Sequence, residues 1–585
     1  MNRNRPRPSR LAALATGLLA LMPAYSYAQY SPAPPRPYPG YINDYLRSKD
    51  PYNNQWDIGV NIRARLENKD NAGFTSAGSN RDFSGGRPTG GAIGTIGKAS
   101  GDRFDNNNTY VLTRIMPRIG YTDKWFSVFT EFRSSDAIDD ERENNGTTFK
   151  PLTGNAVETA NAPGIKAGKG LTEQDTDLNL YQAYFTIGNH KEFPVSAKIG
   201  RQELVPGGVF PTPAGQVGPD QRQVGHFRWN NNGRSFDAAK VRYQNAYFGL
   251  DLWTGGVVYT DDDNFNESHY DTDKFNGAYF NFPTISRREV VEAYIYQRDV
   301  DRASTTEDWA GVPAPFRQPV LQELYTVGLR VKSKPLAYDA WDYSVELMHQ
   351  FGTIRNRDTQ GNAILPINAV GRVAGTAPTA AHLRSVELTQ NASAAIIGAG
   401  YSWTEAAWQP RLGFIYSYAS GDDNASDGES GTFQNQFATT HLHYGYMDLN
   451  SLQNLHDFRT VFTFKPKDTV TVALEHHFQF LATTNDYWYN VAGVARGGGA
   501  TTAGTLPTNG KPLNNGNGFN RNGKYDNALG QELDLVVGWY PKPWLHIEAG
   551  VSHYFAGDYI EQTWAKAPGK SLDASYTYVQ TTFNF

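Results

Sequence analysis

The chain has 585 residues, a net charge of −5, and 13% aromatic residues, among them 34 Tyr and 31 Phe. Its mean hydropathy of −0.56 and the lack of long apolar runs after the N-terminus exclude a bundle of transmembrane helices. The absence of cysteine excludes disulfides, thiolate metal sites and a lipidated N-terminal Cys. An aromatic excess without an apolar excess is typical of a transmembrane β-barrel, in which aromatic girdles lie at both membrane interfaces.

The N-terminus has the pattern of an export signal. The basic stretch MNRNRPRPSR precedes the apolar stretch LAALATGLLALMPA, and Ser26 and Ala28 are the small residues before a cleavage site. We predict a signal peptide over 1–28, cleaved after Ala28. A Pro-rich periplasmic tether follows over 29–54, because proline cannot pair in a sheet. The barrel is predicted over 55–585.

Alternation of apolar and polar residues predicts the first strands. In QWDIGVNIRARLEN, every second residue from Trp56 to Leu66 is apolar, and the residues between them are polar or charged. In a barrel the apolar row faces lipid and the charged row faces the lumen. The hairpin made by YVLTRIMPRIGY and WFSVFTEFR, over 110–133, follows the same rule.

The same pattern predicts eighteen strands, with an allowance of two. They lie near 55–68, 110–121, 125–133, 178–188, 195–204, 235–244, 246–255, 275–282, 288–298, 322–333, 340–351, 392–404, 410–420, 456–465, 468–481, 530–540, 543–556 and 573–585. Short connections such as KPKD and YPKP alternate with long ones, as expected of periplasmic turns and extracellular loops. The predicted fold class is an all-β, antiparallel, up-and-down transmembrane β-barrel, closed by pairing the last strand with the first.

The inward rows predict a polarised lumen, basic along the first strands and mixed to acidic later. The candidate pore-lining residues are Arg63, Arg65, Arg114, Arg118, Glu131, Arg133, Lys240, Arg242, Arg330, Arg411 and Arg459. Arginine suits a carboxylate polymer, because its planar fork binds carboxylates through two hydrogen bonds and stays charged. For each arginine, an equal alternative is that it pairs with an acid across the lumen and braces the wall.

Three motif clusters resemble the alginate export family of outer-membrane barrels. They are KIGRQEL (198–204) with RQVGHFRWNNNGRSFDAAKVRY (222–243), the stretch ASGDDNASDGESGTFQNQFATTHLHYGYMDLNSLQNLHD (419–457), and GQELDLVVGWYPKPWLHIEAGVSHYFAGDYI (530–560). The resemblance implies an eighteen-stranded barrel with a narrow, arginine-lined path for an anionic polyuronate and with loops or turns over its ends. The insert VPGGVFPTPAGQVGPDQ is longer than the family's usual connection.

Within these motifs, six residues are candidates for the rim of the barrel: Arg201, Gln202, Glu203, Arg222, Arg234 and Asp237. Alternation places Arg201 on the lipid side, so a β-bulge or strand end is expected to turn it inward. Arg234 is expected to pair with Asp237 at the base of a loop or to line the entrance.

Metal sites have weak support in the sequence. The acidic loop with Asp422, Asp423, Asp427 and Glu429 contains ligands that suit calcium, but its spacing differs from that of an EF-hand, and we expect a solvated extracellular loop. The histidines His441, His443, His456, His476 and His477 lack partners at ligand spacing and are expected in the wall and loops. We expect no cofactor.

Two functions are consistent with these sequence features. The first is a passive conduit that secretes alginate or a similar acidic polysaccharide, supplied by periplasmic synthesis and secretion proteins. The second is a general or substrate-selective porin for small anionic solutes or oligosaccharides. An enzyme is a third choice, because no G-x-S-x-G or Ser/His pair stands out, and there is no nucleotide-binding motif. We expect a monomer in outer-membrane lipid, without nucleic acid.

Overall fold

The computed structural model describes residues 40–585 except for 71–106, 139–174, 189–192, 208–209, 213–214, 218–221, 246, 259–264, 267–268, 283, 303–319, 335–336, 356–386, 425–426, 442, 490, 492, 494–522 and 564–570. The predicted signal peptide over 1–28 therefore lies outside the described residues. Within the described part, no helix has the length and apolar character needed to cross a membrane.

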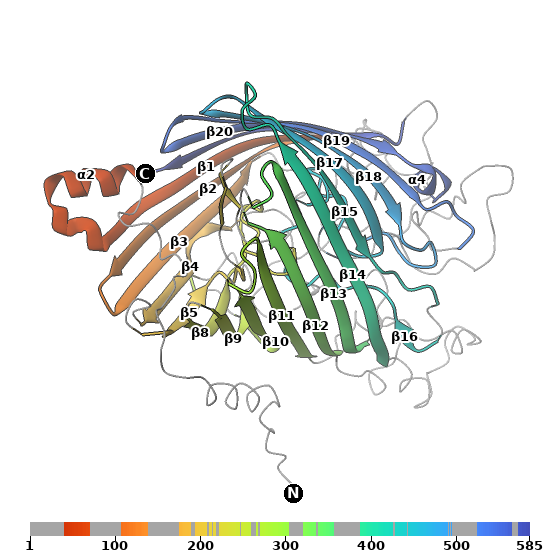
Figure 1. Ribbon diagram of the computed structural model, residues 1–585, viewed down its shortest axis with the longest axis horizontal. Helices are drawn as coiled ribbons and strands as arrows, with labels where there is room; N and C mark the ends of the chain where they lie inside the picture. Colours follow the sequence, from red (N-terminus) through yellow and green to blue (C-terminus); the bar gives the residue numbers. More distant parts are fainter. Residues whose placement is uncertain are drawn as a thin grey trace, which may run out of the picture.

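Eighteen long strands form one closed antiparallel sheet (Figure 1). They are β1 (Trp56–Asp70), β2 (Asn107–Thr122), β3 (Phe126–Ile138), β4 (Asp175–Ile187), β5 (Val195–Gln202), β8 (Phe236–Gln244), β9 (Gly249–Val258), β10 (His269–Phe282), β11 (Glu289–Arg302), β12 (Val320–Ser333), β13 (Trp341–Arg355), β14 (Glu387–Ser402), β15 (Arg411–Ala419), β17 (Leu455–Lys467), β18 (Val470–Leu481), β19 (Ala528–Lys542), β20 (Leu545–Ala556) and β21 (Ala574–Asn584). The hairpin β6 (Phe210–Thr212) with β7 (Gly215–Val217) is separate, and β16 (Glu429–Ser430) pairs with β14.

The predicted closure of the barrel is confirmed. Strand β21 pairs with β1 over ten residues, from Asn61 opposite Asn584 to Asp70 opposite Ser575. The C-terminal Phe585 extends this ladder, because its N–H donates to the Val60 carbonyl at 3.0 Å and its carbonyl accepts from the Val60 N–H at 3.1 Å. Closure leaves neither strand as a free edge.

The strands also have the predicted two faces. On β1, Arg63, Arg65 and Glu67 are buried inside the barrel, whereas Leu66 between them is 48% exposed on the outside. On β21, Tyr576 and Tyr578 are buried, and Val579 is 51% exposed. The outer face is thus apolar and the inner face polar, as a membrane barrel requires.

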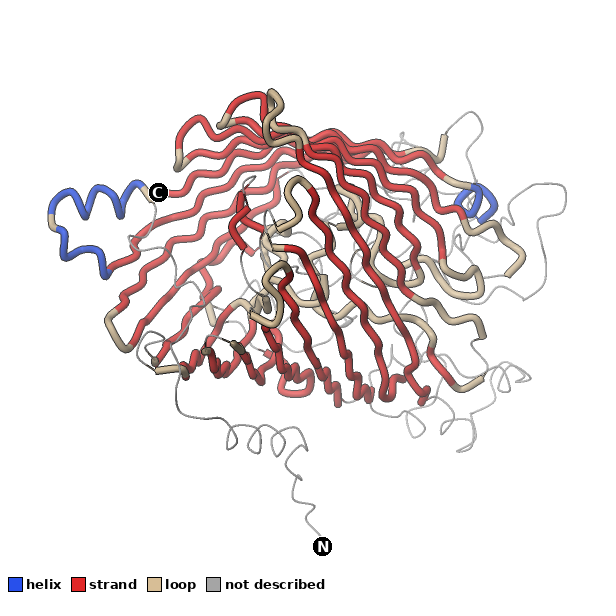
Figure 2. Tube along the Cα trace, viewed as in Figure 1, coloured by secondary structure: helices blue, strands red, loops and turns tan. Residues whose placement is uncertain are grey.

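Two of the long connections run inside the barrel instead of over its end (Figure 2). We call residues 222–235 the first lumenal segment and residues 430–454 the second lumenal segment. They pair with each other at Val224 and Phe437, where Gly225 N donates to Phe437 O at 2.8 Å. Buried side chains such as Phe437, Leu449 and Trp488 form an apolar cluster with inward residues of the wall. The interior therefore contains a packed core as well as charged residues.

Two helical elements lie at the start of the barrel. Helix α2 (Tyr41–Lys49) and the short helix η1 (Pro51–Gln55) precede β1 and lie beside the C-terminus (Figure 1). Asn43 fastens α2 to the strand, because its Oδ1 accepts from Ile58 N at 2.8 Å and its Nδ2 donates to Asp57 Oδ1 at 2.9 Å. This helix lies within the predicted Pro-rich tether, where no helix was expected. A second helix, α4 (Asp558–Thr563), follows β20.

Candidate functional site

The first lumenal segment covers the basic wall that the sequence predicts. Arg63 donates to the carbonyls of Arg228 and Trp229 at 2.8 and 3.1 Å, and Arg114 donates to those of Arg228 and Asn230 at 3.0 and 3.3 Å. The predicted arginines of β1 and β2 thus meet at one place. In each of these four hydrogen bonds, the acceptor is a neutral carbonyl oxygen of the chain itself.

The neighbouring strand β3 holds the end of the same segment. Arg133 Nη1 donates to Asn232 O at 2.6 Å, and Ser135 Oγ donates to Asn232 Oδ1 at 2.6 Å. Asn231 Nδ2 in turn donates to the Thr113 carbonyl at 2.9 Å. The asparagines of the motif FRWNNNGR therefore supply the polar groups that bind the segment to β2 and β3.

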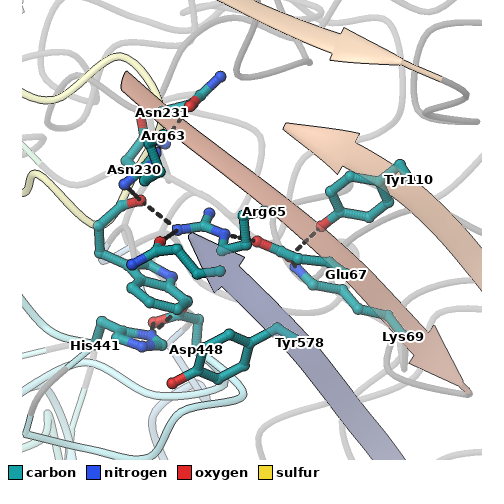
Figure 3. Close-up of polar contacts among 12 residues, drawn as sticks. Arg63, Arg65, Glu67, Lys69, Tyr110, Asn230, Asn231, His441, Asp448 and Tyr578 are labelled. Carbon is teal, nitrogen blue, oxygen red and sulfur yellow. Dashed lines mark hydrogen bonds and ion pairs between the residues drawn. The ribbon is translucent and has the colours of Figure 1, made fainter. Parts of the chain in front are cut away.

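Trp229 is placed between two cationic or ionisable groups. The Arg65 guanidinium carbon lies 4.0 Å from the centre of the Trp229 ring, and the His441 ring is stacked on Trp229 at 3.7 Å and 10°. His441 Nδ1 lies 3.0 Å from Asp448, so the second lumenal segment orients the imidazole. Figure 3 shows Arg63 of β1 close to Asn230 and Asn231, and Arg65 between these asparagines and Glu67, which lies beside Tyr110. This stack joins the wall and both lumenal segments.

Arg228 attaches the first lumenal segment through two carboxylates. Its Nη2 donates to Glu131 Oε2 at 2.9 Å and its Nε donates to Glu203 Oε1, which also accepts from Tyr181 Oη at 2.8 Å. Burial alone would raise the pKa of the Glu203 carboxyl. The nearby charges of Arg228 and His226 and the hydrogen bonds from Arg228 and Tyr181 nevertheless lower that pKa below its ordinary value. Glu203 is therefore ionised at neutral pH and balances Arg228.

The other predicted pore residues form ion pairs along the wall. The pairs are Arg118 with Asp57, Arg242 and Lys240 with Asp251, Arg330 with Glu292, Arg411 with Asp342, and Arg459 with Glu475. Arg298 pairs with Asp273 in the same way. Arg114 differs from these residues, because it forms no ion pair with any described residue. For the paired arginines, the geometry matches the bracing alternative.

The rim motif has a different arrangement from the expected one. Strand β5 stays in register through Arg201, which is opposite Asp237 on the row that also contains the exposed Val241. Arg201 therefore lies on the outward row. There its Nε donates to Asp237 Oδ1 at 2.8 Å and its Nη2 donates to Asp237 Oδ2 at 3.0 Å. No bulge turns Arg201 inward, but β5 does end one residue later, at the buried Gln202, which has the inward position.

Arg234 and Arg222 belong to the first lumenal segment. Arg234 donates to the carbonyls of Gly225 and Ala438 at 3.2 Å, and also to that of Phe437, so it connects the two lumenal segments. It does not pair with Asp237. Burial and the nearby charge of Arg298 lower the pKa of Arg234 to about 10. Arg222 is buried at the start of the segment.

The acidic loop gives its carboxylates local roles. Asp422 Oδ1 accepts from Asn424 N at 3.0 Å, and Asp427 Oδ1 accepts from Glu429 N at 2.9 Å. These hydrogen bonds are turn caps, and residues 425–426 between them are not described. Among the described residues, one group of carboxylates and histidine is close enough to hold a metal ion. It lies outside this loop and consists of Glu475, His477 and Asp534.

A family model described as alginate export matches residues 54–571. This chain belongs to the alginate export family. The match confirms the resemblance seen in the motifs, and it covers nearly the whole predicted barrel. Family membership and the closed eighteen-stranded barrel identify an outer-membrane channel, and they indicate a transport channel rather than an enzyme.

Several solved structures are similar to this alginate export family member. OccAB1 of Acinetobacter baumannii is 10% identical, with a TM-score of 0.47 and coverage of 91% of this chain and 96% of that chain. OccAB2 of the same organism is 10% identical, with a TM-score of 0.46 and coverage of 90% and 98%. OccK11 (OpdR) of Pseudomonas aeruginosa is 10% identical, with a TM-score of 0.42 and coverage of 91% and 96%. The comparison with curated proteins found no match.

The residues that cover the wall could not be placed from the sequence pattern. Trp229, Asn231 and Arg228 lie in the motif that carries the family resemblance, but the motif has no strand periodicity that would place it in the lumen. One signal was present: a tryptophan, three asparagines and two arginines in eight residues, FRWNNNGR, supply far more hydrogen-bonding groups than a solvated loop needs.

Proposed function

We propose that this channel passes an anionic polysaccharide, alginate or a similar polyuronate, out of the cell along the arginines of β1, β2 and β3. The observation that carries the proposal is the set of contacts from Arg63 and Arg114 to neutral carbonyls of the first lumenal segment. A carboxylate is a stronger acceptor for a guanidinium than a carbonyl oxygen. A uronate chain therefore competes for these arginines with the segment that covers them.

The path requires the first lumenal segment to leave the wall. The hydrogen bonds to Asn230, Asn231 and Asn232 are individually modest, because each replaces a hydrogen bond to water. The ion pairs of Arg228 with Glu131 and Glu203 hold the segment more strongly than these hydrogen bonds do. Successive arginines would then hold each uronate weakly enough to release it to the next.

A second function is favoured by the packing of the lumen. With both lumenal segments in place, the arginines already have partners, and the apolar cluster fills the interior beside them. This arrangement suits a porin for small anionic solutes or oligosaccharides that pass without displacing a segment. The two proposals differ in whether the segment moves.

A planar-bilayer recording tests the proposal. An anion-selective current that added polyuronate blocks, and that a neutral glucan of similar length does not block, supports the polymer path. A large current that polyuronate leaves unchanged contradicts it. Cleavage after Ala28, a monomeric channel and delivery by periplasmic synthesis proteins accompany the proposal as predictions.

A further inference from the structure

A second group of charged residues lies inside the barrel on strands β17 to β19, apart from the arginine wall. Its carboxylates belong to Asp457, Glu475, Glu532 and Asp534, and its basic groups to Arg459 and His477. All four carboxylates are buried, and Asp457, Glu532 and Asp534 are 0% exposed. Within this group, the carboxylates exceed the cations by two charges even when His477 is protonated. Buried excess charge is costly unless a further cation or proton balances it.

Strand register brings these side chains together. Glu475 is directly opposite Asp534 across β18 and β19, and His477 is directly opposite Glu532. Directly opposite residues of antiparallel strands have Cβ atoms about 5 Å apart. One nitrogen or oxygen atom from each of Glu475, His477 and Asp534 lies within 4.8 Å of the other two. This spacing allows a single ion to contact all three.

His477 is oriented as a metal ligand would be. Its Nδ1 lies 2.9 Å from Asp457 Oδ1, and its Nε2 faces Glu475 Oε2 at 3.7 Å. A carboxylate that accepts the Nδ1 proton fixes the tautomer and leaves Nε2 free to bind a metal. Glu475 is held by Arg459, whose Nε donates to Glu475 Oε2 at 2.7 Å.

Four buried polar atoms of this group lack a hydrogen bond of regular geometry to any described residue. Among the described residues, neither carboxylate oxygen of Asp534 has a hydrogen-bond partner of normal geometry, and neither has His477 Nε2. Among the described residues, Glu532 Oε2 also has no hydrogen-bond partner of normal geometry. Because buried polar atoms are nearly always hydrogen-bonded, these four atoms require either a bound cation or a proton shared between Glu532 and Asp534.

The second lumenal segment covers part of this group of charged residues. Met447 N donates to Glu532 Oε1 at 2.8 Å, and Asn450 Nδ2 donates to Gln479 Oε1 at 2.7 Å. Gly445 has a φ of +102°, and a Cβ there would lie 2.3 Å from Glu532 Oε2. The segment therefore lies directly against the Glu532 carboxylate, which is fully buried.

We propose that Glu475, His477 and Asp534 bind one divalent transition-metal ion, best matched by Zn²⁺, and that this ion joins β18 to β19 next to the second lumenal segment. Zn²⁺ accepts imidazole nitrogen together with carboxylate oxygen, whereas Ca²⁺ and Mg²⁺ prefer oxygen ligands alone. Asp457 orients the imidazole, and Glu532 links the ion site to the Met447 backbone. The ion also reduces the excess negative charge of the group.

The test uses the purified full-length barrel in detergent, stripped with a chelator and then titrated with zinc sulfate. Elemental analysis and calorimetry should find about one Zn²⁺ per chain, not displaced by equimolar Ca²⁺. Asp534→Asn should weaken binding about tenfold or more, because it removes a ligand. Glu346→Gln is the matched control, since Glu346 is a buried inward carboxylate that already accepts a hydrogen bond from Tyr294; it should bind Zn²⁺ as the wild type does.

A second variant keeps the proposal testable if Asp534→Asn does not fold. Asp457→Asn retains all three ligands and removes only the group that orients His477, so Zn²⁺ binding should weaken about 10- to 100-fold. Absence of stoichiometric Zn²⁺ from the folded wild type overturns the proposal and indicates instead that Glu532 and Asp534 share a proton. Wild-type affinity in both variants overturns it equally. Neither outcome bears on polysaccharide transport.

Discussion

The guanidinium carbon of Arg65 lies 4.0 Å from the centre of the Trp229 ring, so a residue of the barrel wall and a residue of the first lumenal segment form a cation–π contact inside the lumen. His441 covers the opposite face of the same indole. An arginine predicted to line the pore is therefore part of the packing that fills it. Conductance should depend on how firmly this segment is held.

Removal of the indole should loosen the first lumenal segment. Trp229→Ala deletes the contacts with Arg65 and His441, which together are worth about 1–3 kcal/mol. We expect a larger single-channel conductance in planar bilayers. Trp408→Ala, in the short turn after β14, is the control and should conduct as the wild type does. Equal conductance of both variants would show that Trp229 does not hold the segment.

Loss of a wall charge should weaken binding of polyuronate. Arg114→Gln removes a guanidinium that forms no ion pair with the described residues, and a charged hydrogen bond is worth about 1.5–3 kcal/mol. The polyuronate concentration needed for half-maximal block should therefore rise about tenfold or more. Arg411→Gln is the matched control, because Asp342 already balances Arg411. An identical block in all three proteins would exclude Arg114 from the path.

Lowering the pH should break the ion pair between Arg228 and Glu203 that attaches the first lumenal segment to the wall. The pKa of Glu203 is lower in the folded protein than its ordinary value of 4.5, so its pairing with Arg228 stabilises the segment above that value. This stabilisation is lost as pH falls through the lower, folded-state pKa. Wild-type conductance should rise on such acidification, and Glu203→Gln should conduct more than the wild type already at neutral pH.

The control for this titration is Glu323→Gln, which removes a carboxylate that contacts Tyr325 on β12 and not the lumenal segment. It should keep the wild-type pH response. A Glu203→Gln variant with wild-type conductance at neutral pH would show that Glu203 does not fasten the segment.

One glycine should be essential to strand β5. Gly200 has a φ of +120°, and a Cβ there would lie 2.3 Å from the Ala183 carbonyl oxygen of β4. Gly200→Ala should lower the free energy of unfolding by about 1–3 kcal/mol, measured by urea titration in detergent. Gly249→Ala is the matched control, since a Cβ at Gly249 meets nothing closer than 3.6 Å. Equal losses in both variants would contradict the role given to the backbone at Gly200.

The wall of the barrel could be predicted from the sequence, and its contents could not. Strands such as β1 and β21 have a strict two-residue period, so the inward position of Arg65 and the outward position of Val579 follow from the pattern. The pairing of β1 with β21 follows from closure.

The lumenal segments have no such period, because each buried residue there is placed by tertiary contacts. Trp229 is positioned by Arg65 and His441, which come from distant parts of the chain. The group at Glu475, His477 and Asp534 likewise depends on the register between β18 and β19. Arg201 was expected to turn inward because a charge in lipid is costly, but pairing with Asp237 solves the same problem on the outward row.

The central claim, that polymer passes where the first lumenal segment now lies, can be tested with a reversible lock. Ser135 Oγ and Asn232 Oδ1 are 2.6 Å apart, and the chain has no cysteine, so Ser135→Cys with Asn232→Cys introduces a single disulfide between wall and segment. Efflux of labelled polyuronate from liposomes should stop when the disulfide forms and return when it is reduced. Equal efflux through the oxidised and reduced channel would contradict the account.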